Sequence, residues 1–314
     1  MSLRLALFGQ APLAIVCLDR LQEEGHDVRV VYAPEDGSRP DVLAAHARNL
    51  GISVVQRDFF QRKDGSPISD ALNEYQTHEV DLNILASFTS FLPPSIINSP
   101  KHKSICYHPS LLPKYRGGHA LQWQIINGVV ETGVSIFVPD TGIDTGPIVI
   151  QKSGIKISPN ETAGSLFFKK LAPLGADAIL EAVTAIDTAT ASFMEQNETE
   201  ATFDELISES AATIDLKEPA EKVDQLIRGC DPQPGAHLRY SDMLLKLYDV
   251  SLLGSCNQPP GTITGIDDDA MVLALNGGSL RIGRVRGDNG KEPASVFLKR
   301  HALELGAQLT ESKN

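Results

Sequence analysis

Short apolar runs and amphipathic stretches alternate along the first half of the chain. The apolar runs are rich in β-branched residues and predict strands at 3–8, 28–32, 52–55, 82–86 and 104–107. Stretches with helical spacing lie between them, at 12–24, 41–49 and 69–75. This alternation predicts an α/β fold with a Rossmann-like, largely parallel sheet and helices on both of its faces.

The pattern changes in the second half. A long helical stretch covers 162–186, and a polar segment at 195–200 follows it as a predicted connection. One more helix, at 219–228, precedes four short β-rich runs at 244–250, 261–266, 270–275 and 279–285. The sequence thus predicts a catalytic-type α/β domain at 1–205 and a small β-rich, barrel-like (OB-like) domain at 206–314.

Composition narrows the functional classes. The chain has 314 residues, 42% of them hydrophobic and 22% charged, as in soluble globular proteins. No apolar run is long enough to span a membrane, and the first residues lack a signal-peptide layout, so a cytoplasmic protein is expected. The four cysteines are scattered without a CxxC pair and the histidines lack metal-ligand spacing, which predicts no metal site.

Two further classes are disfavoured. The net charge of −12 argues against a large nucleic-acid footprint, which needs a basic surface. The first turn reads Gly9-Gln10-Ala11-Pro12 and lacks the GxGxxG glycines that let a backbone approach a pyrophosphate, so NAD is not expected.

Candidate chemistry is concentrated in residues 104–118 and 132–148. Strand alternation puts Cys106 and His108 on one face of the strand, with Ile105 and Tyr107 on the other. Pro109 cannot continue a sheet ladder, so His108 is predicted at the carboxyl end of its strand, where open α/β sheets bind ligands. Asp144 lies in a glycine-punctuated loop that could fold back over the same edge.

A histidine and a carboxylate fit acyl-group chemistry. Attack on a formyl carbon creates an oxyanion that needs a donor, and a carboxylate can orient or deprotonate the nucleophile. Each residue also has a simpler interpretation, because a histidine before a proline is ordinarily structural and Asp144 could belong to a simple turn. Spacing alone leaves catalysis the minority interpretation.

The motifs themselves resemble a known family. The run from His108 to Gly117, His-Pro-Ser-Leu-Leu-Pro-x-Tyr-Arg-Gly, is followed by Asp144 in Asp-Thr-Gly, and together they resemble the signature of folate-dependent formyltransferases. Further along, the run from Ile227 to Ala236 resembles a motif of the family's C-terminal domain. The subgroup of greatest similarity is the N-terminal hydrolase domain of 10-formyltetrahydrofolate dehydrogenase, with methionyl-tRNA formyltransferase as a more distant relative.

The resemblance implies roles for particular residues. It implies 10-formyltetrahydrofolate as formyl-donor substrate and His108 and Asp144 as catalytic residues, with Ser135 near an attacking water. It also implies that two segments form the walls of the pterin pocket through their backbone groups: Ser87, Phe88, Thr89, Ser90, Phe91 and Leu92, and Val138, Pro139, Asp140, Thr141, Gly142 and Ile143.

Cys106 departs from the family pattern. Most transferases of the family carry an asparagine two residues before the histidine, where it helps to hold the formyl oxygen. A thiol is a poor donor, and loss of one strong donor costs other enzymes about 3 kcal/mol. The hydrolase subgroup also lacks the asparagine. A reactive-thiol role for Cys106 is a minority alternative, because a buried strand cysteine is usually inert.

Three functions stay open at this point. Hydrolysis to formate needs only water, whereas transfer needs a small-molecule or carrier-bound acceptor, an amino-sugar nucleotide or an aminoacyl-tRNA. Residues 206–314 carry 12 Lys and Arg against 15 Asp and Glu, which ranks tRNA below the other acceptors. A weakly catalytic folate-binding protein is the third alternative. For Arg116 two alternatives remain, a pairing with the glutamate tail of folate or a solvated side chain.

Overall fold

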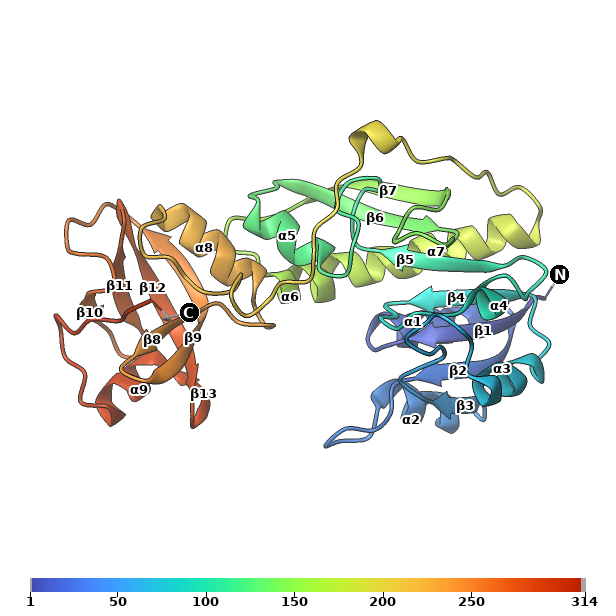
Figure 1. Ribbon diagram of the computed structural model, residues 1–314, viewed down its shortest axis with the longest axis horizontal. Helices are drawn as coiled ribbons and strands as arrows, with labels where there is room; N and C mark the ends of the chain where they lie inside the picture. The colour runs from blue at the N-terminus through green and yellow to red at the C-terminus, as the bar shows by residue number, and fades with distance from the viewer. Residues whose placement is uncertain (1, 312–314) are drawn as a thin grey trace. The chain divides into compact units, whose positions relative to one another are not determined.

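The computed structural model describes residues 2–311, which form two compact units (Figure 1). The first unit comprises residues up to 120 together with 131–155 and 167–204. The second comprises 121–130, 156–166 and the residues from 205 onward. The predicted division into domains at 1–205 and 206–314 stays a prediction.

The first unit is built on a mixed sheet. Among the described residues seven strands pair in the order β3-β2-β1-β4-β5-β6-β7. The pairs from β3 to β5 are parallel, whereas β5 and β6 are antiparallel, so the predicted, largely parallel α/β sheet is confirmed. The strands are β1 (Arg4–Gly9), β2 (Asp27–Ala33), β3 (Ser53–Gln56), β4 (Leu82–Ala86), β5 (Ser104–His108), β6 (Glu131–Phe137) and β7 (Ile148–Lys156).

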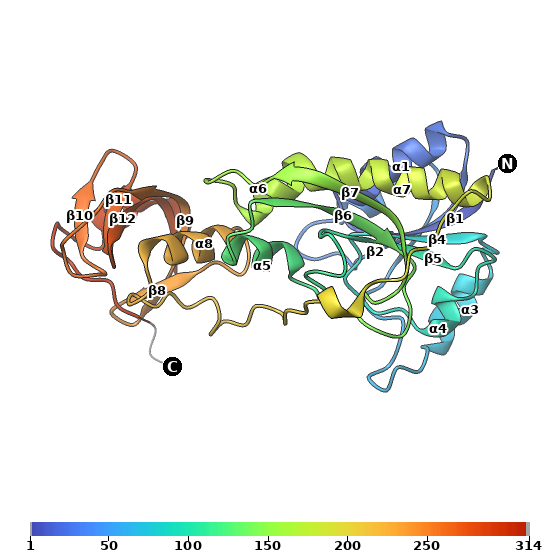
Figure 2. The same cartoon turned by 90° about the horizontal axis from the view of Figure 1, so that it is seen from above.

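Helices cover both faces of this sheet, as predicted. Figure 2 shows α1 and α7 on one face and α3 and α4 on the other. Asp41 caps α2 by accepting a hydrogen bond from the amide of Ala44 at 2.8 Å, which fixes where that helix begins. The helices are α1 (Leu13–Glu23), α2 (Val42–Asn49), α3 (Ser69–Gln76), α4 (Pro94–Ile97), α7 (Ala172–Asp187) and the short 3₁₀ turn η2 (Glu198–Glu200).

The two faces of β5 meet different parts of the unit. Cys106 packs against the buried cluster of Phe8, Tyr75 and Ile96, while the ring of Tyr107 faces Gly175 of α7, where a Cβ atom would lie 2.4 Å from the ring. The predicted alternation along this strand is therefore confirmed. Because β5 is packed on both faces, the backbone that carries His108 is held in place.

The helical stretch predicted at 162–186 is interrupted. It consists of α6 (Ala163–Leu166), a π-helical turn η1 (Phe167–Leu171) and α7. The Tyr107 hydroxyl donates to the Leu171 carbonyl at the end of the π turn, at 3.4 Å. A wider turn releases carbonyls from the regular ladder, and periodicity alone could not reveal it, because the apolar spacing continues across it.

The second unit carries the β-rich part of the chain. In the described residues its strands form an antiparallel half-barrel in the order β10-β11-β12-β9-β8, with β13 paired to β12. This confirms the predicted small antiparallel domain. Its elements are most of α5 (Ala120–Ile126), α6, α8 (Ala220–Gly229), β8 (His237–Tyr240), β9 (Met243–Leu253), β10 (Ile263–Ile266), β11 (Met271–Leu275), β12 (Gly278–Gly287), β13 (Gly290–Pro293) and α9 (Ala294–Arg300).

None of the helices in residues 2–311 is both long enough and apolar enough to cross a membrane.

The contact between Gly175 and Tyr107 gives a stability prediction. Gly175→Val is expected to lower the free energy of unfolding by about 2–3 kcal/mol, because the added carbons would overlap the Tyr107 ring and force β5 or α7 to shift. Urea denaturation followed by circular dichroism measures the change. Gly37→Val is the matched control, since no atom lies within 4 Å of its added Cβ. Equal stability of the two variants would contradict the packing argument.

Candidate active site

His108 ends β5 and is almost fully buried, with 5% of its surface exposed. Its Nε2 atom lies 2.7 Å from the carbonyl oxygen of Tyr115. A carbonyl can only accept, so the proton of this hydrogen bond belongs to Nε2. In the neutral ring Nδ1 then carries the lone pair, and the tautomer is set by the backbone of the Tyr115 turn.

Asp144 faces the other nitrogen of the ring. Its Oδ2 atom lies 3.6 Å from His108 Nδ1 and accepts a hydrogen bond of 2.8 Å from the amide of Gly117. The 3.6 Å separation is longer than a hydrogen bond, so Nδ1 and Oδ2 can both contact one small group placed beside them. The loop that carries Asp144 therefore folds back to His108, as the sequence predicts.

Asp144 is held in an uncommon backbone conformation. Its φ of 56° lies in the left-handed region, which costs a residue other than glycine about 1 kcal/mol or more. Such a conformation persists only where surrounding contacts impose it. At Asp144 these contacts are the Gly117 amide on the carboxylate and the side-chain amide of Gln196 on the main-chain carbonyl, at 2.8 Å.

Cys106 lies two residues before His108, on the same face of β5. Its Sγ atom contacts the carbonyl of Tyr107 at 3.7 Å, and its side chain packs against Leu112, Phe137 and Ile148. Burial raises the pKa of the Cys106 thiol well above its usual range, and the nearby charge of Asp144 raises it further. The thiolate form is thus scarce at neutral pH, which weighs against a nucleophilic role.

The hydroxyl of Ser135 is fully buried and fully hydrogen-bonded. It donates to the carbonyl of Ser110 at 2.7 Å and accepts from the Leu112 amide at 3.1 Å and from Gln151 Nε2 at 2.9 Å. One donor and two acceptor positions are all that a hydroxyl has. This geometry gives Ser135 a role in shaping the loop after His108, and favours it over contact with a water at the reacting centre.

A cavity of about 250 Å³ adjoins the loop that leads from β6 to Asp144. Four residues of that loop, Val138, Pro139, Asp140 and Thr141, form one wall. Gly142 and Ile143 continue the loop, and Ile143 is 45% exposed. Pro147 of the same loop lines the cavity too, and the remaining lining residues are ones that the sequence did not single out: Pro94, Ile97, Asn98 and Lys103.

The loop after β4 does not line that cavity directly. Ser87 has a φ of 60°, Phe88 packs against Phe8 and Phe60, and Leu92 is buried in the same core cluster. Thr89 accepts a hydrogen bond from Gln10, whereas Phe91 is 68% exposed. Ser90 lies between them and is partly exposed. The loop leads straight into α4, which supplies the cavity residues.

Buried polar groups connect α4 to β4 and β5. The Asn83 side chain accepts from the Tyr75 hydroxyl and donates to the carbonyl of Ile96 and to the hydroxyl of Ser104. The Ser104 hydroxyl in turn donates to the carbonyl of Ile97. A fully satisfied network of this kind rigidifies its surroundings, so it fixes one cavity wall relative to the strand that ends in His108.

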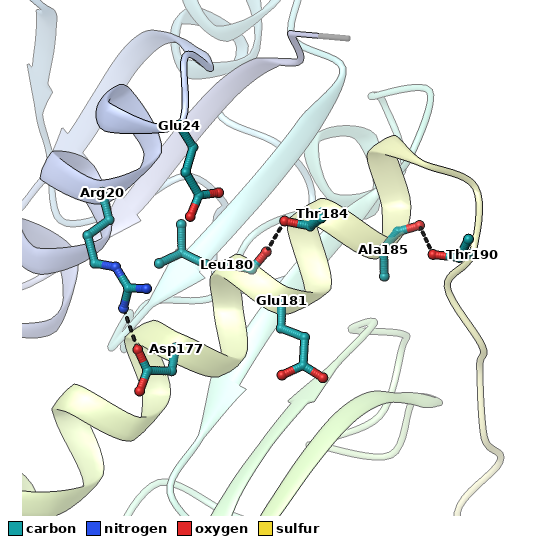
Figure 3. A pocket seen from close by; sticks show the side chains of 8 residues that line it. All are labelled: Arg20, Glu24, Asp177, Leu180, Glu181, Thr184, Ala185 and Thr190. Atoms are coloured by element: carbon teal, nitrogen blue, oxygen red, sulfur yellow. Dashed lines mark hydrogen bonds and ion pairs between the residues drawn. The ribbon is translucent and has the colours of Figure 1, made fainter.

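A larger depression of about 460 Å³ lies away from these residues, between α1 and α7 (Figure 3). Arg20 of α1 pairs there with Asp177 of α7, and Glu24 and Glu181 add negative charge. None of the sequence-predicted site residues lines it. Exposed ion pairs of this kind contribute little to stability or chemistry.

The structure disagrees with both alternatives that the sequence left open for Arg116, a pairing with the glutamate tail of folate and a solvated side chain. Arg116 is 6% exposed rather than solvated, and its guanidinium donates to Gln196 at 3.2 and 2.9 Å and to Glu198 at 2.9 and 2.6 Å. These donors are therefore engaged within the protein and are not offered to a folate tail. Gln196 and the Tyr115 carbonyl are the site residues that sequence reasoning missed, since neither carries a recognisable motif.

Within residues 2–311, no group of three or more His, Cys, Asp or Glu side chains could hold a metal ion.

Comparison with known families agrees with this geometry. Residues 3–183 match the family model described as Formyl transferase, and residues 206–302 match the one described as Formyl transferase, C-terminal domain. The first match covers more than half of the chain and contains both His108 and Asp144.

Individual relatives extend the comparison. Mitochondrial 10-formyltetrahydrofolate dehydrogenase of Mus musculus is 36% identical over 310 residues, which cover 94% of this chain and 33% of the dehydrogenase. The chain thus spans about a third of that relative. Methionyl-tRNA formyltransferase of Lachnospira eligens is 29% identical over 327 residues, covering 98% and 100% of the two chains. The crystal structure of HypX from Aquifex aeolicus with tetrahydrofolic acid shares the fold, with a TM-score of 0.75 at 15% identity over 100% of this chain and 51% of HypX.

The environment of Cys106 predicts its reactivity. Both Cys106 and Cys256 are partly exposed, but iodoacetamide at pH 7.5 is expected to modify Cys106 much more slowly in the native protein, because desolvation and the charge of Asp144 raise the pKa of its thiol. Peptide mass spectrometry measures both, and a guanidinium-unfolded sample is the control in which all four cysteines react. Modification of native Cys106 as fast as Cys256 would restore the reactive-thiol alternative.

Proposed function

The chain belongs to the formyl transferase family, and from this premise we propose that it binds 10-formyltetrahydrofolate and releases the formyl group to water. The observation that carries the proposal is the pairing of His108 Nδ1 with Asp144 Oδ2 across 3.6 Å. It places a potential donor and a potential base where one reacting group can contact both.

The reaction needs an electrophilic carbon, a nucleophile, a group that accepts the proton of the nucleophile and a group that donates to the oxyanion. The water oxygen bonds to the formyl carbon, and the carbonyl oxygen takes up negative charge. We propose that Asp144 accepts the proton lost by the water. We also propose that His108 takes part as the doubly protonated ring, so that Nε2–H stays on the Tyr115 carbonyl while Nδ1–H donates to the oxyanion. The carbon–nitrogen bond then breaks, the proton held by Asp144 passes to the folate nitrogen, and the product leaves as formate after its remaining acid proton is lost to solvent.

The substrate is proposed to lie along the loop that joins the cavity to Asp144. The cavity is lined by the apolar residues Ile97, Val138 and Pro139 and by the polar residues Asp140 and Thr141. A flat heterocycle with a donor–acceptor edge matches such a surface. The Asp140 carboxylate supports this loop by accepting from the amide of Gly142 at 2.9 Å and from the hydroxyl of Thr145 at 2.6 Å.

Formyl transfer to an amine is the second candidate. It is favoured by the similarity to methionyl-tRNA formyltransferase of Lachnospira eligens, which is 29% identical over 327 residues. The excess of acidic over basic residues in 206–314 weighs against an RNA acceptor. Formate release from 10-formyltetrahydrofolate alone supports hydrolysis, turnover only with an added amine supports transfer, and tight binding without turnover supports a folate-binding role.

Asp144→Asn tests the proposed base. The amide keeps the shape of the side chain but cannot take a proton, so kcat for formyl release is expected to fall by about 10²–10⁴-fold while tetrahydrofolate binding persists. Absorbance of the folate product measures turnover, and isothermal titration measures binding. Asp288→Asn makes the same change at an exposed position and is expected to leave both unchanged. Wild-type turnover in Asp144→Asn would remove Asp144 from the mechanism.

His108→Ala tests the proposed donor. Removing the imidazole is expected to lower kcat by about 10²–10³-fold, because the oxyanion loses its main donor. The same assay measures the loss of kcat. Circular dichroism checks that the variant stays folded although removal of the ring leaves an empty space inside the protein. If the folded variant keeps the wild-type kcat, a group other than His108 must act as donor to the oxyanion.

Cys106→Asn tests the missing donor. An amide offers two N–H groups where a thiol offers one weak donor, so kcat is expected to rise by about tenfold or more. Cys106→Ala is the matched control and is not expected to raise the rate. An unchanged rate in Cys106→Asn would mean that Cys106 only fills space. A loss of rate in both variants would point instead to a role for the thiol itself.

A further inference from the structure

One extended segment contacts both halves of the candidate site. Residues 194–204, here called the strap, run beside the loop that carries Asp144 and the turn that carries Tyr115. At one end, Met194 exchanges two backbone hydrogen bonds with Ile148, at 2.8 and 2.9 Å. At the other, Thr202 accepts from the amides of Tyr115 and Arg116 and donates to the carbonyl of Pro113. The strap is thus attached on either side of the catalytic pair.

Gln196 is the strap residue that reaches Asp144. Its Nε2 atom donates to the carbonyl of Asp144 at 2.8 Å and to the carbonyl of Gly146 at 2.7 Å. Both hydrogens of the amide are used by these two acceptors. The side chain therefore ties down the loop on either side of Thr145, where the left-handed backbone of Asp144 needs external support.

Arg116 decides which way the amide of Gln196 points. Its Nε and Nη2 atoms donate to Gln196 Oε1 at 3.2 and 2.9 Å, so that oxygen must face the guanidinium. A flipped amide would set N–H groups against the guanidinium and an oxygen against two carbonyls, and both arrangements are repulsive. Glu198 holds Arg116 in turn through two hydrogen bonds and compensates its buried charge.

We propose that Gln196, oriented by Arg116, is a positioning residue that holds Asp144 opposite His108. The strap links Arg116 and Tyr115 through their backbone, so the same segment supports the carbonyl that sets the His108 tautomer. The inference rests on the proposed function for its kinetic readout, but the geometry that it describes can be measured without turnover.

Gln196→Glu is the sharpest variant. It keeps the length of the side chain and an oxygen for Arg116, but it replaces the donor that holds the carbonyls of Asp144 and Gly146 by an acceptor. A displaced Asp144 is expected to lower kcat by about 10–100-fold with KM for 10-formyltetrahydrofolate changed less than about threefold. Glu200→Gln, an exposed change on the same strap, is the control and is expected to match wild type.

A second variant guards against misfolding. Arg116→Lys keeps the charge but cannot contact Gln196 and Glu198 together. It is therefore expected to lower kcat as well, but by a smaller factor than Gln196→Glu does. If Gln196→Glu fails to fold, Arg116→Lys carries the test. Wild-type kcat in whichever variant is folded would overturn the positioning role, and so would a rise in KM with kcat unchanged.

A spectroscopic readout separates this inference from the proposed function. The ¹⁵N and ¹H resonances of the His108 ring report its tautomer and its neighbour at Nδ1, whether or not the protein turns over formylfolate. Gln196→Glu is expected to shift the Nδ1 resonance, and Glu200→Gln is expected to leave it in place. If wild type proves inactive but this shift occurs, the proposed function fails and the positioning stands; unchanged His108 resonances would overturn the positioning itself.

Discussion

The hydrogen bond from His108 Nε2 to the Tyr115 carbonyl determines how the rest of the site is arranged. It commits one ring nitrogen to the backbone and turns the other toward Asp144. The turn that provides this carbonyl is itself constrained, because Tyr115 has a φ of 58° and its amide donates to Thr202. Gly117, two residues on, then donates to the Asp144 carboxylate. One short turn thus sets the tautomer of the histidine and the position of its partner.

The mixed sheet explains why two loops can meet at one histidine. In a wholly parallel sheet the chain beyond β5 would return through a crossover on the face of the sheet. Here β6 runs antiparallel to β5 and pairs Ser135 with His108, so the chain leaves β6 beside Cys106 and folds back as the Asp144 loop. The same pairing buries Ser135, whose hydroxyl shapes the loop after His108. In this protein a change of strand direction, and not a glycine-rich turn, brings the two loops together.

Hydrophobic patterning predicted most elements because each strand and helix carries its own periodic signal. The strands at 82–86 and 104–107, the helix at 219–228 and the β-rich second half follow that signal closely, whereas β6 and β7 were not predicted as strands. The contacts that orient the site carry no such signal. Arg116 and Gln196 lie 80 residues apart, and the partner of His108 is a main-chain carbonyl that any residue could supply. The apolar pattern could not predict the π turn before α7 either, since this turn changes the hydrogen bonding without changing the apolar spacing. Local composition therefore predicts the framework, while the orientation of the reacting groups depends on long-range backbone contacts.

The proposed mechanism gives the thiol of Cys106 an effect on the rate and not on the choice of acceptor. A tetrahedral oxyanion forms whether the formyl carbon is attacked by water or by an amine, so under the proposed mechanism a weak donor at this position would slow both reactions by a similar factor. Discrimination between the two nucleophiles has to arise elsewhere, from groups that bind the amine or exclude water while the carbon is exposed. In the proposed mechanism, His108, Asp144 and Cys106 would therefore serve either reaction. The residues that separate hydrolysis from transfer are those that admit or exclude a second substrate, and these lie outside the catalytic pair.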